Sequence, residues 1–561
     1  GALRNMRGPI GSTLVFAIII AICSDAIELP PTGEREPATT DAARQLADRS
    51  ELSGVDAAGK LVGMIDAHAH LTAAEAFGGA LRCGRPFAEG GVATALAPCP
   101  EQAGAQPGSL LEAVIGGGAP VPDGGGGWPG FESWPRHDTV LHEQAQIDGI
   151  ERAWRAGLRV VNTLLVANRV ICELSPQRRH HACDEMEEIH IQANYLRAMQ
   201  DHVDATHGGP GRGWFRIATS PEQVRSIAAQ GKLAVIIGVE NSELFGCREI
   251  RDVAQCTVAD IDRGLDEMQA LGVSNLFPVH KFDNAFGGTR FDPGLAGAAI
   301  NVGNLLATGH WWQAESCTGA ADHEQLFADS ALSDLLAGGA TGLPSGTVVP
   351  VYPSGPVCNI RGLTALGRHL VHGMIARGMV INIDHMSVRA ARDTLEIAEA
   401  AGYPGIISAH TWADREMVDR VLALGGFVGS YAYAAADAGD GEPDFLSEWR
   451  ANTSGPHGDR VTGYGYGSDV NGLAVLAAPR LDAAQRPLTY PFRAPNGVEF
   501  DRQRVGDRVY DLNLDGVAQY GLYADWYADV IRTAGDDGDE LACELMNGAE
   551  DFVAMWESAR R

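Results

Sequence analysis

The chain has 561 residues, of which 45% are hydrophobic, so it can bury a sizeable core and wholesale disorder is excluded. This length fits one large elaborated domain or two to three ordinary domains. The formal net charge of −29 argues against a nucleic-acid partner and against an anionic membrane surface, because both select a basic protein face. We therefore expect an acidic soluble protein.

The N-terminal segment has the pattern of an export signal. Arg4 and Arg7 precede an apolar run at residues 12–23, which is too short to span a bilayer but suits a signal peptide. We expect a signal peptide over residues 1–26, a linker over 27–60, and a secreted, periplasmic or cell-surface protein without a stable transmembrane span. A lipid anchor on Cys23 is the less favoured alternative, since the preceding Ile22 is bulky.

Cysteine usage fits an exported protein. Beyond Cys23 there are nine cysteines, and several of them are close in sequence, namely Cys83 and Cys99, Cys172 and Cys183, and Cys247 and Cys256. Oxidising compartments permit disulfides across such short loops, although the pairing does not follow from the sequence. None of the cysteines forms a C-x-x-C motif, which argues against a cysteine zinc site. We expect Cys543 to be a buried free thiol.

After residue 60, short apolar and β-branched runs alternate with helical patterns. Unbroken apolar strands are typical of a sheet that is buried on both faces. Eight such runs are present, at residues 63–67, 157–166, 232–240, 273–280, 378–385, 405–410, 425–431 and 461–469. Helices are predicted between them, for example from the capping Ser220 to Gly231 and from Ser387 to Gly402. The alternation predicts an α/β fold, a (β/α)8 TIM barrel over residues 61–561.

Two connections in this pattern are too long for a plain barrel. They cover about residues 71–156, after strand 1, and about 285–360, after strand 4. Both follow a strand, so both are expected at the C-terminal face of the barrel, where they could shape a substrate pocket. A floppy insertion is an equal alternative for the glycine-rich part. Residues 178–190 contain three histidines, but we interpret them as an exposed helix and its lead-in rather than as a second metal site.

Polar side chains stand at the ends of the predicted strands. A barrel gathers the C-terminal ends of all its strands around one mouth, so residues far apart in sequence should converge there. Each taken alone could be an ordinary buried polar group, but together they predict a metal centre. The seven residues are His68, His70, Glu240, His280, His385, His410 and Asp469.

The residue types suggest the chemistry of this centre. Imidazole and carboxylate suit zinc and similar divalent ions, so we expect a divalent metal, with two Zn²⁺ ions favoured. Glu240 could bridge two ions, which would lower the pKa of a shared water and polarise a substrate carbonyl. Asp469 would take the proton from that water and pass it to the leaving group, while His280 would stabilise the oxyanion. The metal ligands would then be His68 and His70 on one ion and His385 and His410 on the other.

At these residues the sequence resembles the amidohydrolase superfamily and, within it, the renal (membrane) dipeptidase family of metallopeptidases. The matching pieces are "GVEN", "FPVHKFDN", "INIDHMSV", "IISAHTWAD", "GYGSDVNG" and the C-terminal tail, in the same order from about residue 60 to 557. The resemblance implies a binuclear zinc site in which Glu240 bridges, His385 and His410 hold the second ion, Asp469 shuttles the proton and His280 faces the oxyanion. It also implies hydrolysis of a dipeptide-like amide bond.

Two departures from the family pattern bear on the substrate. The first motif is His68-Ala-His70, whereas the family has H-x-D, so the first ion would keep more positive charge. The family also has an arginine after the strand 6 histidine that holds the substrate carboxylate, and no arginine has that spacing after His410. Arg415 is the nearest substitute.

Three functions stay open from the sequence. The leading prediction is an exported, dipeptidase-like metallohydrolase that cleaves an amide bond in a small-molecule or dipeptide-like substrate, with a homodimer left open. The second keeps the barrel and the metals but acts on a lactone, an ester or an N-acyl compound. The third is a barrel that binds metal without catalysis. Asp469 and His280 argue against this third function, because a binding protein needs neither a proton shuttle nor an oxyanion partner.

Overall fold

The computed structural model describes residues 54–116, 119–175, 177–319, 348–433, 444–453 and 463–561. The predicted signal peptide and most of the predicted linker lie outside these residues. The last part of that linker is described, and it forms a turn in which Asp56 Oδ1 accepts hydrogen bonds from the backbone N–H groups of Ala58 and Lys60. Val55 then pairs with Leu61, where the folded domain begins.

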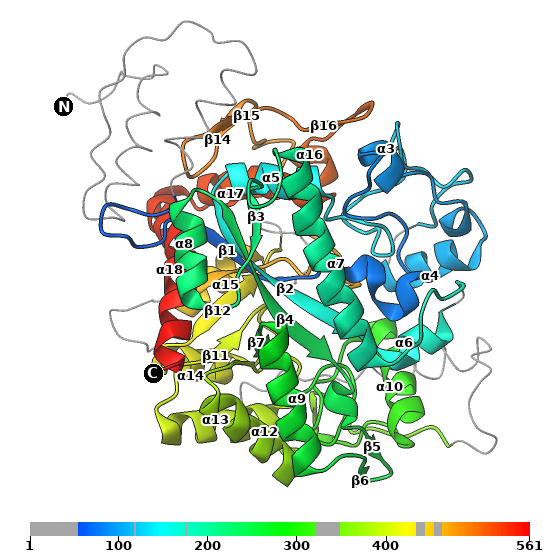
Figure 1. The fold of residues 1–561 in the computed structure, drawn as a ribbon. Helices are drawn as coiled ribbons and strands as arrows, with labels where there is room; N and C mark the ends of the chain where they lie inside the picture. Colours follow the sequence, from blue (N-terminus) through cyan, green and yellow to red (C-terminus); the bar gives the residue numbers. More distant parts are fainter. Residues whose placement is uncertain (1–53, 117–118, 176, 320–347, 434–443, 454–462) are drawn as a thin grey trace, which may run out of the picture.

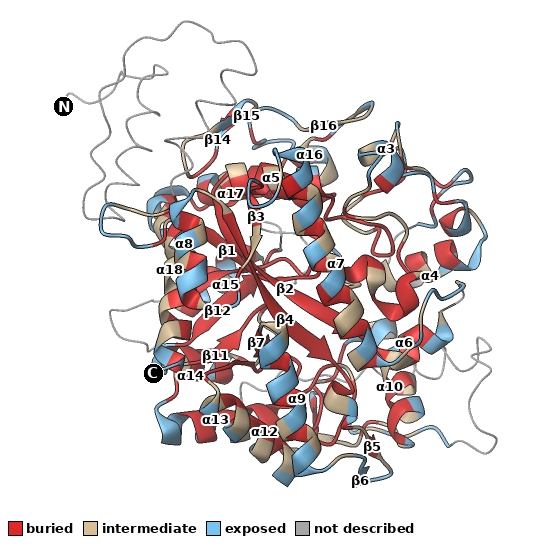
Figure 2. Ribbon diagram, viewed as in Figure 1, coloured by how far each residue is buried: buried red, intermediate tan, exposed pale blue. Residues whose placement is uncertain are grey.

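Eight parallel strands close into a barrel, which confirms the predicted fold. Every one of these strands is buried along its length, as the red ribbons of β2 and β4 illustrate in Figure 2. Helices cover the outside of such a barrel and side chains fill the inside. Pairing runs around the ring and closes between β2 and β4, and β3 (Phe215–Ile217) adds to the start of β4. The barrel strands are β1 (Met64–Ala69), β2 (Leu158–Ala167), β4 (Leu233–Asn241), β7 (Val273–Leu276), β10 (Val380–Asn382), β11 (Ile406–Ser408), β12 (Phe427–Tyr431) and β13 (Tyr464–Gly467).

The helices between the strands begin and end where the sequence predicts. Ser220 caps α8 by accepting a hydrogen bond from the Gln223 N–H, and Ser387 caps α13 in the same way. Gly402 ends α13 in the left-handed conformation, with φ of 60°. The helices around the barrel are α7 (Glu185–Thr206), α8 (Pro221–Ala229), α9 (Val258–Leu271), α12 (Ala365–Ala376), α13 (Val388–Ala401), α14 (Arg415–Ala423) and α15 (Phe445–Thr453).

The C-terminal helices α17 (Tyr523–Thr533) and α18 (Gly538–Ala559) complete the shell. Side chains of α18, among them Phe552 and Trp556, pack in one buried cluster with Ile65 of β1 and Phe427 of β12. The centre of the barrel is therefore a packed core rather than a channel. Functional groups are left with the opposite, C-terminal ends of the strands.

The two predicted insertions lie on that side of the barrel, on the right of Figure 1. The connection from β1 to β2 contains α3 (Val92–Ala95), α4 (Pro107–Gly116) and α5 (Ile147–Arg155). The connection from β7 to α12 contains α10 (Gly294–Thr308) and the hairpin of β8 (Ala314–Ser316) and β9 (Val357–Asn359). Part of the second insertion, residues 320–347, lies outside the described residues.

Four disulfides close loops in the described residues, one in each of the two insertions, one between β2 and α7 and one between β4 and α9. They join the three sequence-neighbour pairs and also Cys317 with Cys358, which flank the hairpin insertion. The expectation of a free thiol at Cys543 is wrong, because this cysteine is disulfide-bonded. The physical reason is its position, since the Cys543 side chain is half-buried on α18 rather than enclosed in the core. None of the helices within the described ranges has the length and apolar character to cross a bilayer.

Candidate metal centre

The seven predicted residues converge at the C-terminal mouth of the barrel. Glu240 lies within β4, and His68 lies in β1 with His70 directly after it. The other four follow β7, β10, β11 and β13 by two to four residues, so the strands place them at one rim. The register between β1 and β2 shifts between Asp66 and Ala69, and such an irregularity re-aims the side chains that follow it.

Glu240 stands between two groups of histidines. Its Oε2 atom lies 3.5 Å from His68 Nε2 and 3.3 Å from His70 Nε2. Its Oε1 atom lies 3.3 Å from His385 Nε2 and 3.4 Å from His280 Nε2. One carboxylate therefore offers one oxygen to each group, which is the arrangement of a bridging ligand.

The remaining distances tie the two groups together. His68 Nε2 and His70 Nε2 are 3.1 Å apart, and His70 Nε2 lies 3.1 Å from Asp469 Oδ1. On the other side His385 Nε2 and His410 Nε2 are also 3.1 Å apart. His410 additionally falls into a compact set with His68 and Glu240, and its ring stacks on that of His68 at a centroid distance of 3.9 Å. All seven predicted residues thus belong to one buried cluster.

Hydrogen bonds behind two of the histidines fix the direction of their lone pairs. His70 Nδ1 lies 2.9 Å from the Leu164 carbonyl, which can only accept, so Nδ1 carries the proton and Nε2 keeps a free lone pair. His410 Nδ1 lies 2.6 Å from Asp384 Oδ2, so here too Nδ1 donates to an acceptor and Nε2 keeps its lone pair. The Asp384 carboxylate is held in turn by Ser408 Oγ, which donates to it at 2.5 Å. Both lone pairs therefore point into the cluster.

These residues fit a pair of divalent metal ions. Ligand atoms around a tetrahedral ion with bonds of about 2.1 Å lie about 3.4 Å apart. The nitrogen and oxygen atoms here are 3.1 to 3.5 Å apart. Glu240 Oε1 is buried and has no hydrogen-bond partner among the described residues, which a cation at this point would provide. Imidazole and carboxylate donors of this kind suit zinc.

The charges within the cluster also favour a bound cation. Burial opposes a positive charge on His68, but Glu240 and Asp469 outweigh it and raise the pKa of His68 to about 10. Burial lowers the pKa of His280 to about 3, so that side chain is neutral. The carboxylates at this rim therefore stabilise a positive charge at or near His68. His280 keeps a neutral imidazole that can donate one hydrogen bond.

Two of the seven residues lie nearest to solvent. His280 and Asp469 are each 7% exposed, whereas the other five residues are at most 2% exposed. Asp469 and His385 both have a positive φ, of 49° and 66°, which is uncommon for residues other than glycine and concentrates at functional sites. The more open positions suit groups that meet a substrate, and the deeper ones suit ligands.

Several supporting residues escaped the sequence reasoning. Asp384 precedes His385 directly and orients His410, and a carboxylate next to a candidate ligand is a signal that could have identified it. Trp412 stacks on His385 at 5.4 Å, and Lys281 Nζ lies 5.0 Å from the centre of the Trp412 ring. Arg415 does not take a place in the cluster, because it donates to Asn452 Oδ1 and pairs with Asp419.

No protein-family model matches the sequence, and no curated protein matches it. Solved structures do match. An amidohydrolase from Pseudomonas aeruginosa is 12% identical with a TM-score of 0.39, covering 74% of this chain and 94% of that one. A dipeptidase of metallopeptidase family M19 is 15% identical with a TM-score of 0.41, covering 74% and 89%.

A third solved structure is a metallopeptidase from Rhodobacter sphaeroides, liganded with a phosphinate mimic of the dipeptide L-Ala-D-Ala. It is 15% identical, covers 74% of this chain and 90% of that one, and has a TM-score of 0.41. These names belong to the group that the sequence motifs resemble.

Proposed function

We propose that the chain is a metal-dependent hydrolase that cleaves an amide bond in a dipeptide-like substrate. The observation that carries this proposal is the position of Glu240, whose two carboxylate oxygens face separate groups of imidazole Nε2 atoms at 3.3 to 3.5 Å. Structural polar networks pair their donors and acceptors, whereas here the Nε2 lone pairs of His70 and His410 point into a cluster that also holds two carboxylates. That pattern is what a binuclear metal site requires.

In this proposal five residues are metal ligands. His68 and His70 would hold one ion, His385 and His410 would hold the other, and Glu240 would be a ligand shared by both. When bound, such ions lower the pKa of a water and polarise a carbonyl. The Leu164 carbonyl and Asp384 keep the rings of His70 and His410 in the orientation that this requires.

Asp469 and His280 carry out the proton transfer and the charge stabilisation. Asp469 Oδ1 accepts the proton from the attacking water and returns it to the nitrogen of the leaving amine, so that the C–N bond breaks and an acid and an amine result. His280, which is neutral and faces Glu240 from the open side, donates a hydrogen bond to the oxygen on which negative charge develops. Both steps use the two residues nearest to solvent.

A second candidate substrate class is a lactone, an ester or an N-acyl compound. The position of Arg415 favours it, since this guanidinium is held by Asn452 and Asp419 and is not part of the cluster. A substrate without a free carboxylate would not need a cation there. The same ions and the same Asp469 and His280 would serve this reaction.

The test is a substrate panel on the purified, zinc-loaded protein. A set of dipeptides is compared with their C-terminally amidated forms, with N-acyl amino acids and with lactones. Hydrolysis of free dipeptides supports the first proposal, and hydrolysis confined to amidated or lactone substrates supports the second. The proposal of a hydrolase is abandoned if the metal-loaded protein turns over none of these compounds.

We also propose that the protein is exported. Support comes from the four disulfides in the described part of the chain and from the pattern of the N-terminal segment. Edman sequencing or mass spectrometry of the secreted protein would give the mature N-terminus. Detection of the uncleaved chain in the cytoplasm alone would contradict export. The homodimer stays a prediction.

A further inference from the structure

A cavity of about 710 Å³ lies in the insertion between β1 and β2, away from the seven residues of the metal centre. Two short disulfide-closed loops frame it, one closed by Cys83 and Cys99 and the other by Cys172 and Cys183. The second loop contributes Gln177, Arg178 and His180 to the lining. We call it the arginine cavity, after Arg82, Arg85 and Arg178 in its lining.

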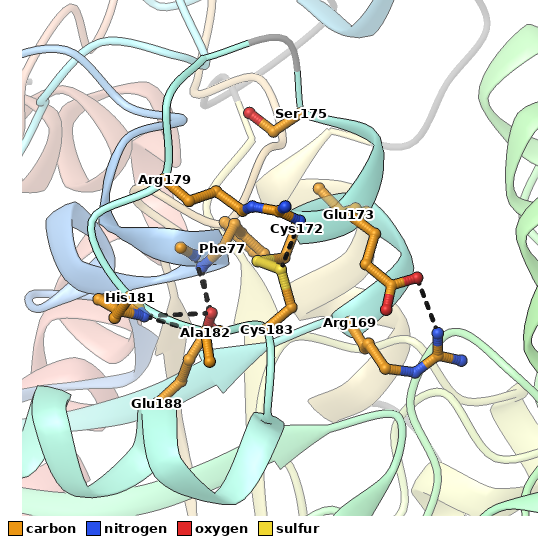
Figure 3. Close-up of a disulfide and its surroundings, with 12 residues drawn as sticks. Phe77, Arg169, Cys172, Glu173, Ser175, Arg179, His181, Ala182, Cys183 and Glu188 are labelled. Carbon is orange, nitrogen blue, oxygen red and sulfur yellow. Dashed lines mark hydrogen bonds and ion pairs between the residues drawn. A yellow bond between two sulfur atoms is a disulfide. The ribbon is translucent and has the colours of Figure 1, made fainter.

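Hydrogen bonds fix the second loop against the insertion, as Figure 3 shows in part. The Glu188 carboxylate accepts the backbone N–H groups of Phe77 at 2.9 Å and of Gly78 at 2.7 Å. The Gly78 carbonyl accepts the N–H of His180 at 2.7 Å. The second loop is therefore closed by its disulfide and bound through His180 to Gly78, which α7 holds in turn through Glu188. A cavity held in this way is preorganised for a ligand, which reduces the entropy lost on binding.

The lining of the cavity is cationic in a strongly acidic protein. It contains three arginines and the carboxylate of Glu101, while the whole chain has a net charge of −29. Arg85 is already paired with Glu75, at 2.5 Å. Arg178 is exposed, and no ion pair involves it within the part of the chain that the structure describes. Its charge is available to a ligand.

Arg82 adds a buried positive charge. Its side chain is 7% exposed and donates to the carbonyls of Val140, His142 and Asn471, at 2.7, 2.9 and 2.5 Å. These carbonyl partners are neutral, but the buried carboxylates of Glu143, Glu112 and Asp469 also interact with the guanidinium and balance part of its charge. Arg82 Nε is buried and has no hydrogen-bond partner among the described residues. An anion in the cavity would give this buried donor a hydrogen-bond acceptor.

Two further features of the cavity lining indicate which chemical groups the ligand carries. Gln102 is 2% exposed, its amide donates to the Leu81 carbonyl, and its Oε1 has no hydrogen-bond partner in the described ranges. This oxygen can accept a hydroxyl or an amide N–H. Helix α4 begins at the cavity, where Pro107 and Gly108 are part of the lining, and a helix N-terminus favours negative charge.

We propose that the arginine cavity binds a small polyanion that also carries a hydroxyl or an amide N–H. Its carboxylate or phosphate groups face Arg178 and Arg82, and its donor faces Gln102. The anion is either a free small molecule or the acidic end of the substrate, and this second source rests on the proposed function. The cavity and the metal centre are linked through Arg82, which donates a hydrogen bond to the carbonyl of Asn471, two residues after Asp469.

The test is isothermal titration calorimetry on the full, metal-loaded protein with sn-glycerol 3-phosphate and with L-malate, which combine negative charge with hydroxyl donors. Both are expected to bind saturably, and uncharged glycerol is not. Arg178→Gln should weaken binding about tenfold, because one charge-assisted contact is lost. Gln106→Glu at the exposed edge of the lining should weaken it and Gln106→Lys should strengthen it.

Arg212→Gln is the matched control, since it removes one exposed arginine in the loop before β3 and should leave binding unchanged. The proposal is overturned if neither anion binds, or if Arg178→Gln and both Gln106 variants bind like the wild type. Rates of hydrolysis measured with and without sn-glycerol 3-phosphate then identify the source. Competition with a dipeptide indicates the acidic end of the substrate, and an unchanged rate indicates a free anion. Calorimetry needs no turnover, so failure of the proposed hydrolase would leave this result readable.

Discussion

The metal centre and the arginine cavity are built by different means. The centre takes its residues from the ends of the barrel strands, and each candidate ligand there is at most 2% exposed. The cavity takes its residues from irregular loops, which two disulfides and the hydrogen bonds of Glu188 hold in place. Sheet geometry positions the first set, and covalent and local bonds position the second.

This difference has a consequence for how each region should respond to damage. Strand ends are held by the whole barrel core, so the metal centre should withstand the loss of a local bond in an insertion. The cavity has no regular sheet beneath its loops and depends on a few specific bonds. The following experiments separate the two regions, beginning with the largest expected effect.

Asp469→Asn removes the proton acceptor that we propose for the metal centre. We expect the rate of hydrolysis to fall about 10²- to 10⁴-fold, since general acid–base catalysis contributes that much. The measurement is kcat/KM together with zinc content, because Asp469 Oδ1 also lies 3.1 Å from His70 Nε2. Anion binding in the arginine cavity should not change. Wild-type activity in this variant would remove Asp469 from the mechanism.

Replacing Cys172 and Cys183 together by serine opens the loop that forms one wall of the cavity. A disulfide that closes a loop of this length contributes about 3 kcal/mol to the free energy of unfolding. Hydrogen exchange should show faster opening of residues 172–183 and of the contacting residues 77 and 78, with zinc content unchanged. Equal protection in both proteins would mean that the hydrogen bonds of Glu188 suffice.

Asp384→Asn disturbs the orientation of His410 without removing a candidate ligand. Supporting partners of metal-bound histidines contribute about 10- to 100-fold to metal affinity. We expect a loss of that size in a zinc competition titration. The comparison with Asp469→Asn is informative, because we expect Asp384→Asn to lower the zinc affinity and, only as a consequence, the rate of hydrolysis. Unaltered zinc affinity would show that Asp384 is only a core residue.

Arg415→Gln is expected to have the smallest effect. Its guanidinium is held by Asn452 and Asp419 away from the cluster, so KM should stay within about twofold of the wild type, as expected for a half-buried pair outside the site. KM is measured with the best substrate of the panel. A rise of tenfold or more would place Arg415 in substrate binding after all.

Much of the barrel and its mouth could be predicted from the sequence, for a physical reason. Buried parallel strands are mostly apolar, so histidines that follow such a run are conspicuous, as at His385 and His410. The barrel then brings such residues together whatever their separation in sequence. Helix ends such as Ser387 and Gly402 follow from local hydrogen bonding and backbone conformation alone.

The rest could not be predicted because it depends on partners that have no sequence pattern. The role of Asp384 depends on its hydrogen bond with His410, and the sequence does not show that these two residues are in contact. The arginine cavity joins residues near 82, 102 and 178, which lie in loops without periodicity. Cys543 was expected to be free and is bonded, since a lone cysteine in the sequence does not reveal its exposure on α18.

The metal stoichiometry of the purified protein tests the central claim most directly. Inductively coupled plasma mass spectrometry after equilibration with zinc and gel filtration should give two ions per chain for the wild type. Glu240→Gln, which keeps the size of the side chain but removes its charge, should give one ion or none. A wild-type protein that retains no zinc, or a Glu240→Gln variant that retains two ions, would contradict a bridged pair of cations at the barrel mouth.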